Sequence, residues 1–157
     1  CCIGEGVLTL NLEQRNSTVQ ISPNVTILSG EVKQYKNRLA QSGIQYIADY
    51  IFGVTKQPIN YIVVGIDGSP TTANTAKLGD EQFRKVFTTQ YMNNMYPTFE
   101  TFFTRDEANF HWRELGVYAG GSEGTDTGIL IARVVVNEEK DITKTVSVIW
   151  EFRVSNP

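Results

Sequence analysis

Histidine and cysteine, on which many catalytic and metal sites depend, are almost absent from this chain. Its 157 residues include one histidine, His111, and two cysteines, Cys1 and Cys2. A catalytic triad built on His111 would need a serine or cysteine beside the imidazole and an acid behind it, and the neighbouring sequence supplies no such arrangement. A single histidine also excludes a histidine-rich metal site. We therefore interpret His111 as a surface or strand histidine, and predict no enzyme activity, no catalytic or metal-binding residues and no cofactor.

Long apolar runs and clusters of basic residues are also missing. No apolar run approaches the roughly 18 residues that a helix needs to cross a bilayer. Lysine and arginine total 14 against 17 acidic residues, so the formal net charge is -3, and the basic residues are scattered apart from pairs such as Arg84-Lys85. A nucleic-acid groove needs basic residues clustered to bind phosphates. We therefore expect neither nucleic acid nor a membrane among the partners.

The two cysteines are adjacent and cannot staple the core. Neighbouring cysteines rarely bond to each other, because the ring that closes is strained and far from normal disulfide geometry. Three interpretations of Cys1 and Cys2 stay open. They are two free thiols on a loose terminus, an inter-subunit disulfide with a neighbouring chain, or the site of a lipid anchor.

What the chain does have is the composition of one globular domain rich in strands. Hydrophobic residues make up 41% and charged residues 20%, and a chain of this length buries roughly 68–70% of its unfolded surface. Alternating apolar residues predict strands, clearest in the last one, where Trp150 and Phe152 lie on the packed face. Ser22-Pro23-Asn24 predicts a turn between two short strands. The strands are predicted at residues 7–12, 19–21, 25–28, 61–65, 83–89, 97–103, 112–118, 129–136 and 146–154.

One helix is predicted, over residues 32–52. Ile44, Ile47, Ala48 and Ile51 follow the spacing of a single buried stripe, and Gly53 suits the left-handed residue just past a helix end. The fold class is therefore mainly β: an antiparallel β-sandwich or partly closed barrel with one helix on its amino-terminal side. We expect two parts. Residues 1–31 form an extended, strand-rich arm that pairs with a neighbour's sheet edge, and residues 32–157 form the helix and sandwich domain.

A charged pair interrupts the strand predicted at 112–118. Because neighbouring residues on a strand face opposite sides, Trp112 and Glu114 share one face and Arg113 lies on the other. One of the two charges then lies near the core and needs a partner, since a lone buried charge is costly. We expect the following residues to determine core packing and strand register: Trp112, Arg113, Glu114, Trp150 and Phe152.

The remaining polar motifs are too incomplete to predict a site. The acidic pairs Asp106-Glu107 and Glu138-Glu139 flank strands, where charges usually belong to solvated turns. Residues 65–68 lack the lysine and serine or threonine of a phosphate-binding loop. The glycine-rich residues 120–126 precede a strand rather than a helix, and we expect them to form a hairpin tip.

Six segments nevertheless follow one another in a recognisable order. They are Asn60-Tyr61-Ile62-Val63-Val64-Gly65; Thr75-Ala76-Lys77-Leu78-Gly79-Asp80-Glu81 with Arg84-Lys85; Thr98-Phe99-Glu100-Thr101-Phe102-Phe103; Glu107-Ala108-Asn109 with Trp112-Arg113-Glu114-Leu115-Gly116-Val117-Tyr118; Ile129-Leu130-Ile131-Ala132-Arg133-Val134-Val135; and Lys144-Thr145-Val146-Ser147-Val148-Ile149-Trp150-Glu151-Phe152. Together with a helix from about residue 38, this order resembles a widespread family of tailed-bacteriophage structural proteins, of the tail-fibre or neck-appendage type. The resemblance covers roughly residues 38–154.

The resemblance implies a virion structural protein present in many copies at the neck, collar, tail or fibre base. Its expected partners are copies of itself and other virion proteins, such as portal, neck, tail or fibre adaptors, in a particle assembled in the host cytoplasm. The motif residues then determine the fold rather than catalyse a reaction. The alternative is a receptor- or glycan-binding module, with four aromatic side chains as exposed platforms: Tyr91, Tyr96, Phe110 and Tyr118.

Overall fold

The computed structural model describes residues 20–36, 38–72 and 74–155. The strand predicted at residues 7–12 and the two cysteines lie outside these residues. The described chain forms one helix and ten strands, whose bounds are β1 (Gln20–Leu28), β2 (Val32–Lys36), β3 (Arg38–Leu39), α1 (Gln41–Phe52), β4 (Ile59–Gly65), β5 (Glu81–Val86), β6 (Thr89–Asn93), β7 (Tyr96–Phe103), β8 (His111–Ala119), β9 (Ile129–Glu139) and β10 (Val146–Ser155).

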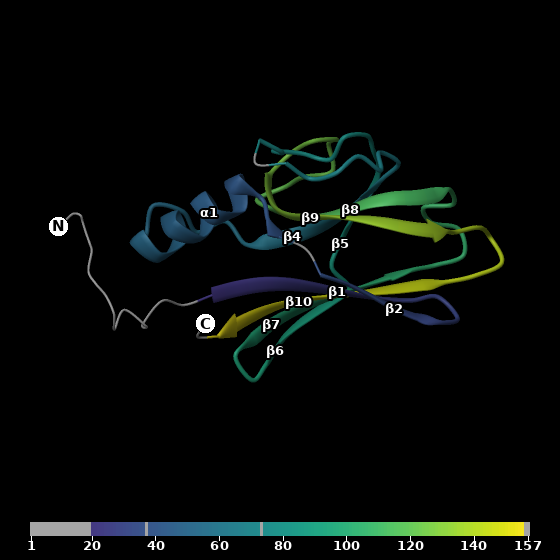
Figure 1. The fold of residues 1–157 in the computed structure, drawn as a ribbon, viewed down its shortest axis with the longest axis horizontal. Helices are drawn as coiled ribbons and strands as arrows, with labels where there is room; N and C mark the ends of the chain where they lie inside the picture. Colours follow the sequence, from purple (N-terminus) through teal and green to yellow (C-terminus); the bar gives the residue numbers. More distant parts are fainter. Residues whose placement is uncertain (1–19, 37, 73, 156–157) are drawn as a thin grey trace.

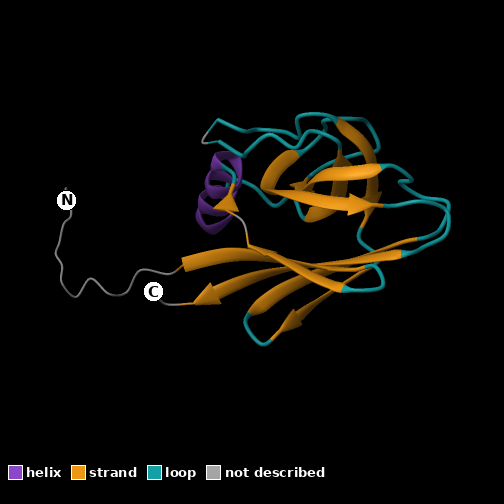
Figure 2. Ribbon diagram, turned by 45° about the vertical axis from the view of Figure 1, so that its right-hand side comes forward, coloured by secondary structure: helices purple, strands orange, loops and turns teal. Residues whose placement is uncertain are grey.

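The strands form two antiparallel sheets that pack face to face as a β-sandwich, which confirms the predicted fold class and selects the sandwich over the barrel (Figure 1). The first sheet has the order β2-β1-β10-β7-β6 and the second the order β3-β9-β8-β4-β5. Figure 2 shows the helix at one end of the two layers, near the amino end of β1. The sheets therefore leave α1 with one face toward the sandwich and one face away from it.

The amino-terminal strand is longer and more central than the sequence suggested. Residues 20–28 form one continuous strand that pairs with β10 at nine positions, from Gln20 opposite Ser155 to Leu28 opposite Ser147. Pro23 lies within this strand because β2 pairs with β1 only from Asn24 onward. A proline is tolerated where one side of a strand has no ladder to complete. The prediction of a turn at Pro23 is therefore wrong. The predicted arm, residues 1–31, includes β1, which is a strand of the sandwich.

The predicted helix begins nine residues too early. Residues 32–36 form β2, which folds back on β1 after a turn in which Gly30 has φ 95°. Pairing with β1 outweighs the local helical pattern, as tertiary contacts commonly do. The carboxyl end of the helix matches the prediction: Gly53 adopts the left-handed conformation, with φ 93°, and its N–H donates to the carbonyls of Asp49 and Tyr50.

The buried face of α1 matches the predicted one only in part. The residues buried against the sandwich are Gly43 and Tyr46. The helix approaches β9 so closely at Gly43 that a Cβ there would lie 2.1 Å from the carbonyl oxygen of Ile131. Such an approach is possible only for glycine. Of the predicted stripe, Ile47 is half-buried against the core, whereas Ile44, Ala48 and Ile51 are exposed.

Two apolar clusters stabilise the fold. The larger lies between the sheets and is centred on Trp112, Trp150 and Phe103, with the Phe103 and Trp112 rings 4.9 Å apart edge to face. The smaller lies on the outer face of the second sheet, where Leu78 of the loop between β4 and β5 covers Tyr118. Strand β4 is consequently buried on both faces, as its continuous apolar run predicts.

Candidate functional site

The pairing of β8 with β9 contains a β-bulge at Arg113. The register with β9 shifts between Trp112 and Glu114, so that Arg113 faces two residues of β9. A bulge changes which residues share a face. Trp112 therefore joins Leu115 in the core between the sheets, and Glu114 lies on the opposite face. The expected pairing of Trp112 with Glu114 on one face is wrong for this reason.

Of the five residues expected to determine packing and register, four are buried. Trp112, Glu114 and Trp150 have no exposed surface and Phe152 is buried among the same core residues. Arg113 is exposed. The bulge places it on the surface, so it belongs to neither the core nor the buried pair.

Glu114 is the centre of a buried polar cluster on the outer face of the second sheet. Its carboxylate accepts hydrogen bonds from the backbone N–H groups of Asp67, Gly79 and Asp80, at 3.0, 2.8 and 2.8 Å. It also accepts a hydrogen bond from Nε of Arg133, at 2.9 Å. Glu114 therefore fastens both ends of the loop between β4 and β5 to the sheet.

Arg133 of β9 completes this cluster from the other side. Its Nη1 donates to the carbonyl oxygen of Ser69 and to Oγ1 of Thr71, and its Nη2 donates to the carbonyl oxygen of Asp67. The partner of the buried glutamate is thus Arg133 and not a neighbour in sequence. The available signal was a lone arginine in the middle of the apolar run at residues 129–136, because such a residue needs a buried partner.

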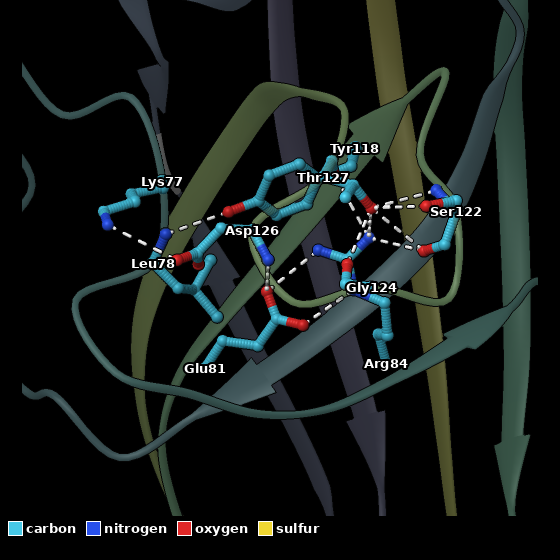
Figure 3. Close-up of polar contacts among 9 residues, drawn as sticks. All are labelled: Lys77, Leu78, Glu81, Arg84, Tyr118, Ser122, Gly124, Asp126 and Thr127. Carbon is cyan, nitrogen blue, oxygen red and sulfur yellow. Dashed lines mark hydrogen bonds and ion pairs between the residues drawn. The ribbon is translucent and has the colours of Figure 1, made fainter.

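A second cluster surrounds Arg84 of β5 (Figure 3). Its guanidinium binds Glu81 through Nε and Nη2, at 2.7 and 2.9 Å. Its Nη1 donates to the carbonyl oxygens of Ser122 and Thr127, at 2.9 and 3.0 Å, and to Oγ1 of Thr127, at 2.9 Å. Arg84 therefore fixes the glycine-rich loop between β8 and β9, which is a hairpin tip as expected.

The environment of Arg84 favours its charged form. Burial acts to lower the pKa of Arg84, but the hydrogen bonds and charge of Glu81 outweigh burial and raise that pKa above its ordinary value. The rings of Tyr61 and Tyr118 lie on the guanidinium, with centroids 5.3 and 5.1 Å from its carbon. Such contacts add cation–π attraction.

Tyr118 connects the two clusters. Its hydroxyl accepts a hydrogen bond from the backbone N–H of Leu78, at 2.9 Å, and burial raises its pKa to about 12. In Figure 3, Asp126 approaches the same region, where its N–H donates to Glu81 and its carboxylate pairs with Lys77. The buried polar groups of both clusters bind one another and the backbone, which is the arrangement of a structural brace.

A depression of about 270 Å³ lies beside the Glu114 cluster. Within it, the carboxylate of Asp67 accepts hydrogen bonds from N–H and Oγ of Ser69, at 2.8 and 2.7 Å, and these bonds lower the pKa of Asp67. The lining residues are Asp67, Ser69, Pro70, Thr72, Asn74, Thr75, Lys77, Leu78, Gly79 and Arg133. Among its charged groups, Lys77 pairs with Asp126 and Arg133 pairs with Glu114, while the carboxylate of Asp67 is held by Ser69.

His111 lies at the edge of a second depression, of about 550 Å³. Its side chain is exposed, with Nδ1 3.1 Å from a carboxylate oxygen of Glu139 and Nε2 against the amide oxygen of Asn137. The neighbouring Glu138 is buried and pairs with Lys33 at 2.8 Å. His111 is thus a surface strand histidine, as interpreted from the sequence. Within residues 20–36, 38–72 and 74–155, no group of three or more histidine, cysteine, aspartate or glutamate side chains could hold a metal ion.

Eight of the exposed large apolar side chains in the described residues lie in two segments. One is α1 and the segment that follows it, with Ile44, Tyr50, Ile51, Phe52 and Val54. The other is the β6–β7 hairpin, with Tyr91, Met92 and Met95. The predicted buried stripe included two of these residues, Ile44 and Ile51, because spacing alone cannot tell which side of a helix faces the sheets.

The four aromatic platforms expected for glycan binding do not form one surface. Tyr91 is exposed, Tyr96 and Phe110 are half-buried, and Tyr118 is fully buried under Leu78. Tyr118 is therefore a core residue and cannot serve as the exposed platform that the glycan-binding alternative requires.

The one helix in the described part of the chain is too short to cross a membrane. Compared with family models, curated proteins and solved structures, the chain matches none of them.

Proposed function

We propose that this chain is a structural protein of the tailed-bacteriophage virion, present in several copies at the neck, collar, tail or fibre base. It acts by holding neighbouring subunits, both copies of itself and other virion proteins, through its packing surfaces. The work is mechanical, and many weak contacts in a symmetric assembly supply the strength that a single contact lacks.

The observation that carries this proposal is the uncovered apolar surface at the end of α1. Ile51 is 82% exposed, Phe52 84% and Val54 66%. Burying each such side chain would contribute roughly 1.5–3 kcal/mol. Three large apolar side chains exposed within four residues indicate an interaction surface, and another side of the helix packs against β9 at Gly43.

The resemblance to tailed-phage structural proteins gives independent support. Several of the residues that carry it are the ones that brace the two loops: Gly79, Glu81, Arg84, Glu114 and Arg133. Residues shared for structural reasons are what a family of assembly proteins requires, because each subunit must present its surfaces in a fixed geometry. A receptor- or glycan-binding module is less well supported, since Tyr91 alone among the four aromatic candidates is exposed.

The proposal is tested on particles of the phage that encodes the chain. A cryo-electron microscopy map of purified particles should contain the chain in several symmetric copies. A variant with Ile51→Glu and Phe52→Glu should be incorporated at least tenfold less than the wild type while its purified form keeps the same thermal unfolding midpoint.

The matched control is Ile142→Glu, because Ile142 is also exposed, at 61%, but lies on the turn between β9 and β10. This control should be incorporated normally. Absence of the chain from particles, or specific binding of a cell-wall glycan by the isolated chain, would overturn the proposal.

A further inference from the structure

The sheet edges of the sandwich differ in how they are protected against pairing with another chain. Edge strands are usually blunted by charged residues, proline, bulges or short length. Strand β5 carries Glu81, Arg84 and Lys85, and its register with β4 is irregular. Strand β2 carries Lys33 and a second lysine among five residues, and β3 has only two residues. These three edges all carry such devices.

Strand β6 carries none of them. Its sequence, Thr89-Gln90-Tyr91-Met92-Asn93, contains no charged residue and no proline. Its five pairs with β7 run without a register shift, and all five side chains are exposed. Among the described residues, β7 is its one strand neighbour. Alternate N–H and C=O groups of β6 consequently point away from the sheet, in the way that another strand requires.

We infer that β6 pairs antiparallel with β6 of a second copy of this chain, across a two-fold axis near Tyr91. This inference rests on the proposed function and names one of its contacts. The pairing joins two five-stranded sheets into one continuous sheet of ten strands. The binding partner of β6 is a strand, because the edge presents unpaired backbone N–H and C=O groups.

The lack of charge argues for a second copy as the occupant. Two-fold pairing brings a strand against itself, so any charge on the strand would meet the same charge on the partner. No residue of β6 is charged, so the strand brings no like charge of its own against its copy, and the carboxylate of Glu100 on β7 accepts a hydrogen bond from the Tyr91 hydroxyl. A strand that selects a different protein is commonly marked by complementary charges.

The side chains beside the edge fit this geometry. Gln90 and Met92 lie opposite Phe99 and Pro97 on β7 and share their face. A depression of about 290 Å³ runs along these residues. With Tyr91 on the axis, Met92 of one copy lies opposite Gln90 of the other and diagonal to its Met92. Met92 is 65% exposed in the single chain, and this pairing covers it.

The experiment measures self-association by sedimentation velocity over a concentration series. The wild type should show a monomer–dimer equilibrium. Met92→Lys and Met92→Glu, measured separately, should each raise the dimer dissociation constant at least tenfold, because like charges then face each other across the axis. An equimolar mixture of the two variants should recover a dissociation constant within threefold of the wild type. Ile142→Lys should associate as the wild type does.

Any other outcome contradicts the proposed pairing of β6 with β6. A wild type that stays monomeric at the highest attainable concentration means that β6 takes a strand of another protein or none. A wild-type dimer that Met92→Lys leaves unchanged forms elsewhere, and a mixture without recovery excludes the two-fold contact. Thermal unfolding of each variant checks that the fold is intact. The proposed function is tested separately by incorporation into particles, so its failure and the failure of this contact are distinguishable.

Discussion

The carboxylate of Glu114 and the guanidinium of Arg133 form an ion pair that is closed to solvent, with 0% and 2% of their side chains exposed. The 2.9 Å contact joins β8 to β9. Burying two charges costs free energy. Their mutual attraction offsets this cost only when the remaining hydrogen-bonding groups of both side chains have partners. Here three backbone N–H groups complete the carboxylate, and three further oxygens receive the guanidinium.

Glu114→Gln should therefore destabilise the protein strongly. The substitution leaves Arg133 as a buried charge without a counter-charge, which costs about 3–5 kcal/mol when one partner of such a pair is removed. Urea unfolding followed by tryptophan fluorescence measures the change. The control is Arg113→Gln, one position away and exposed, which should stay within about 0.5 kcal/mol of the wild type. Equal effects of the two substitutions would contradict the assignment.

Arg84→Lys should loosen the loop between β8 and β9. Lysine cannot reproduce the two-pronged contact with Glu81 and the bonds to Ser122 and Thr127 at the same time. We expect a loss of about 1–3 kcal/mol of stability. Limited proteolysis should cut within residues 120–128 at least threefold faster than in the wild type. Arg105→Lys, at an exposed position, should leave the cleavage rate unchanged, and faster cleavage elsewhere only would show that Arg84 does not hold this loop.

Thr101 and Thr98 should respond oppositely to the same substitution. Both are buried on β7, but the hydroxyl of Thr101 has no hydrogen-bond partner among the described residues, whereas that of Thr98 donates to the carbonyl oxygen of Tyr96. Thr101→Val removes an unpaired polar group and should stabilise the fold by about 1 kcal/mol, while Thr98→Val should destabilise it by about the same amount. Thermal unfolding of the two variants checks this. A loss of stability in Thr101→Val would reveal a partner for its hydroxyl.

Tyr118 should make the protein sensitive to alkali. Burial raises its pKa to about 12 from the ordinary value of 10.0. Its neutral form is favoured in the folded state, so its contribution is complete below pH 10 and is lost as the pH rises toward 12. The unfolding free energy of the wild type should fall across this interval more steeply than that of Tyr118→Phe, by up to about 1.4 kcal/mol per pH unit. Parallel curves for the two proteins would contradict the prediction.

Periodicity predicted most of this fold because most of its strands have one face buried. The strand at residues 146–154 alternates without interruption, and the structure has β10 there. The failures have local causes that alternation does not encode. Pro23 is tolerated because β2 does not pair with β1 at that position. Residues 32–36 form a strand because they pair with β1. The bulge at Arg113 places Trp112 and Glu114 on opposite faces of β8.

The candidate site was predicted only in part for a different reason. The need for a partner to a buried charge near Glu114 follows from its position in an apolar strand. The identity of that partner depends on the pairing of β8 with β9, which brings together residues that are distant in sequence. The glycine-rich loop was recognised by composition, but its attachment to Arg84 requires the folded sheet.

The pairing of β1 with β10 also sets the order of events during biosynthesis. These two strands come from opposite ends of the described chain, so β1 must wait until the ribosome has released β10 before their ladder can close. Contacts between such distant segments slow folding. The nascent polypeptide therefore carries an incomplete first sheet until β10 has emerged from the ribosome.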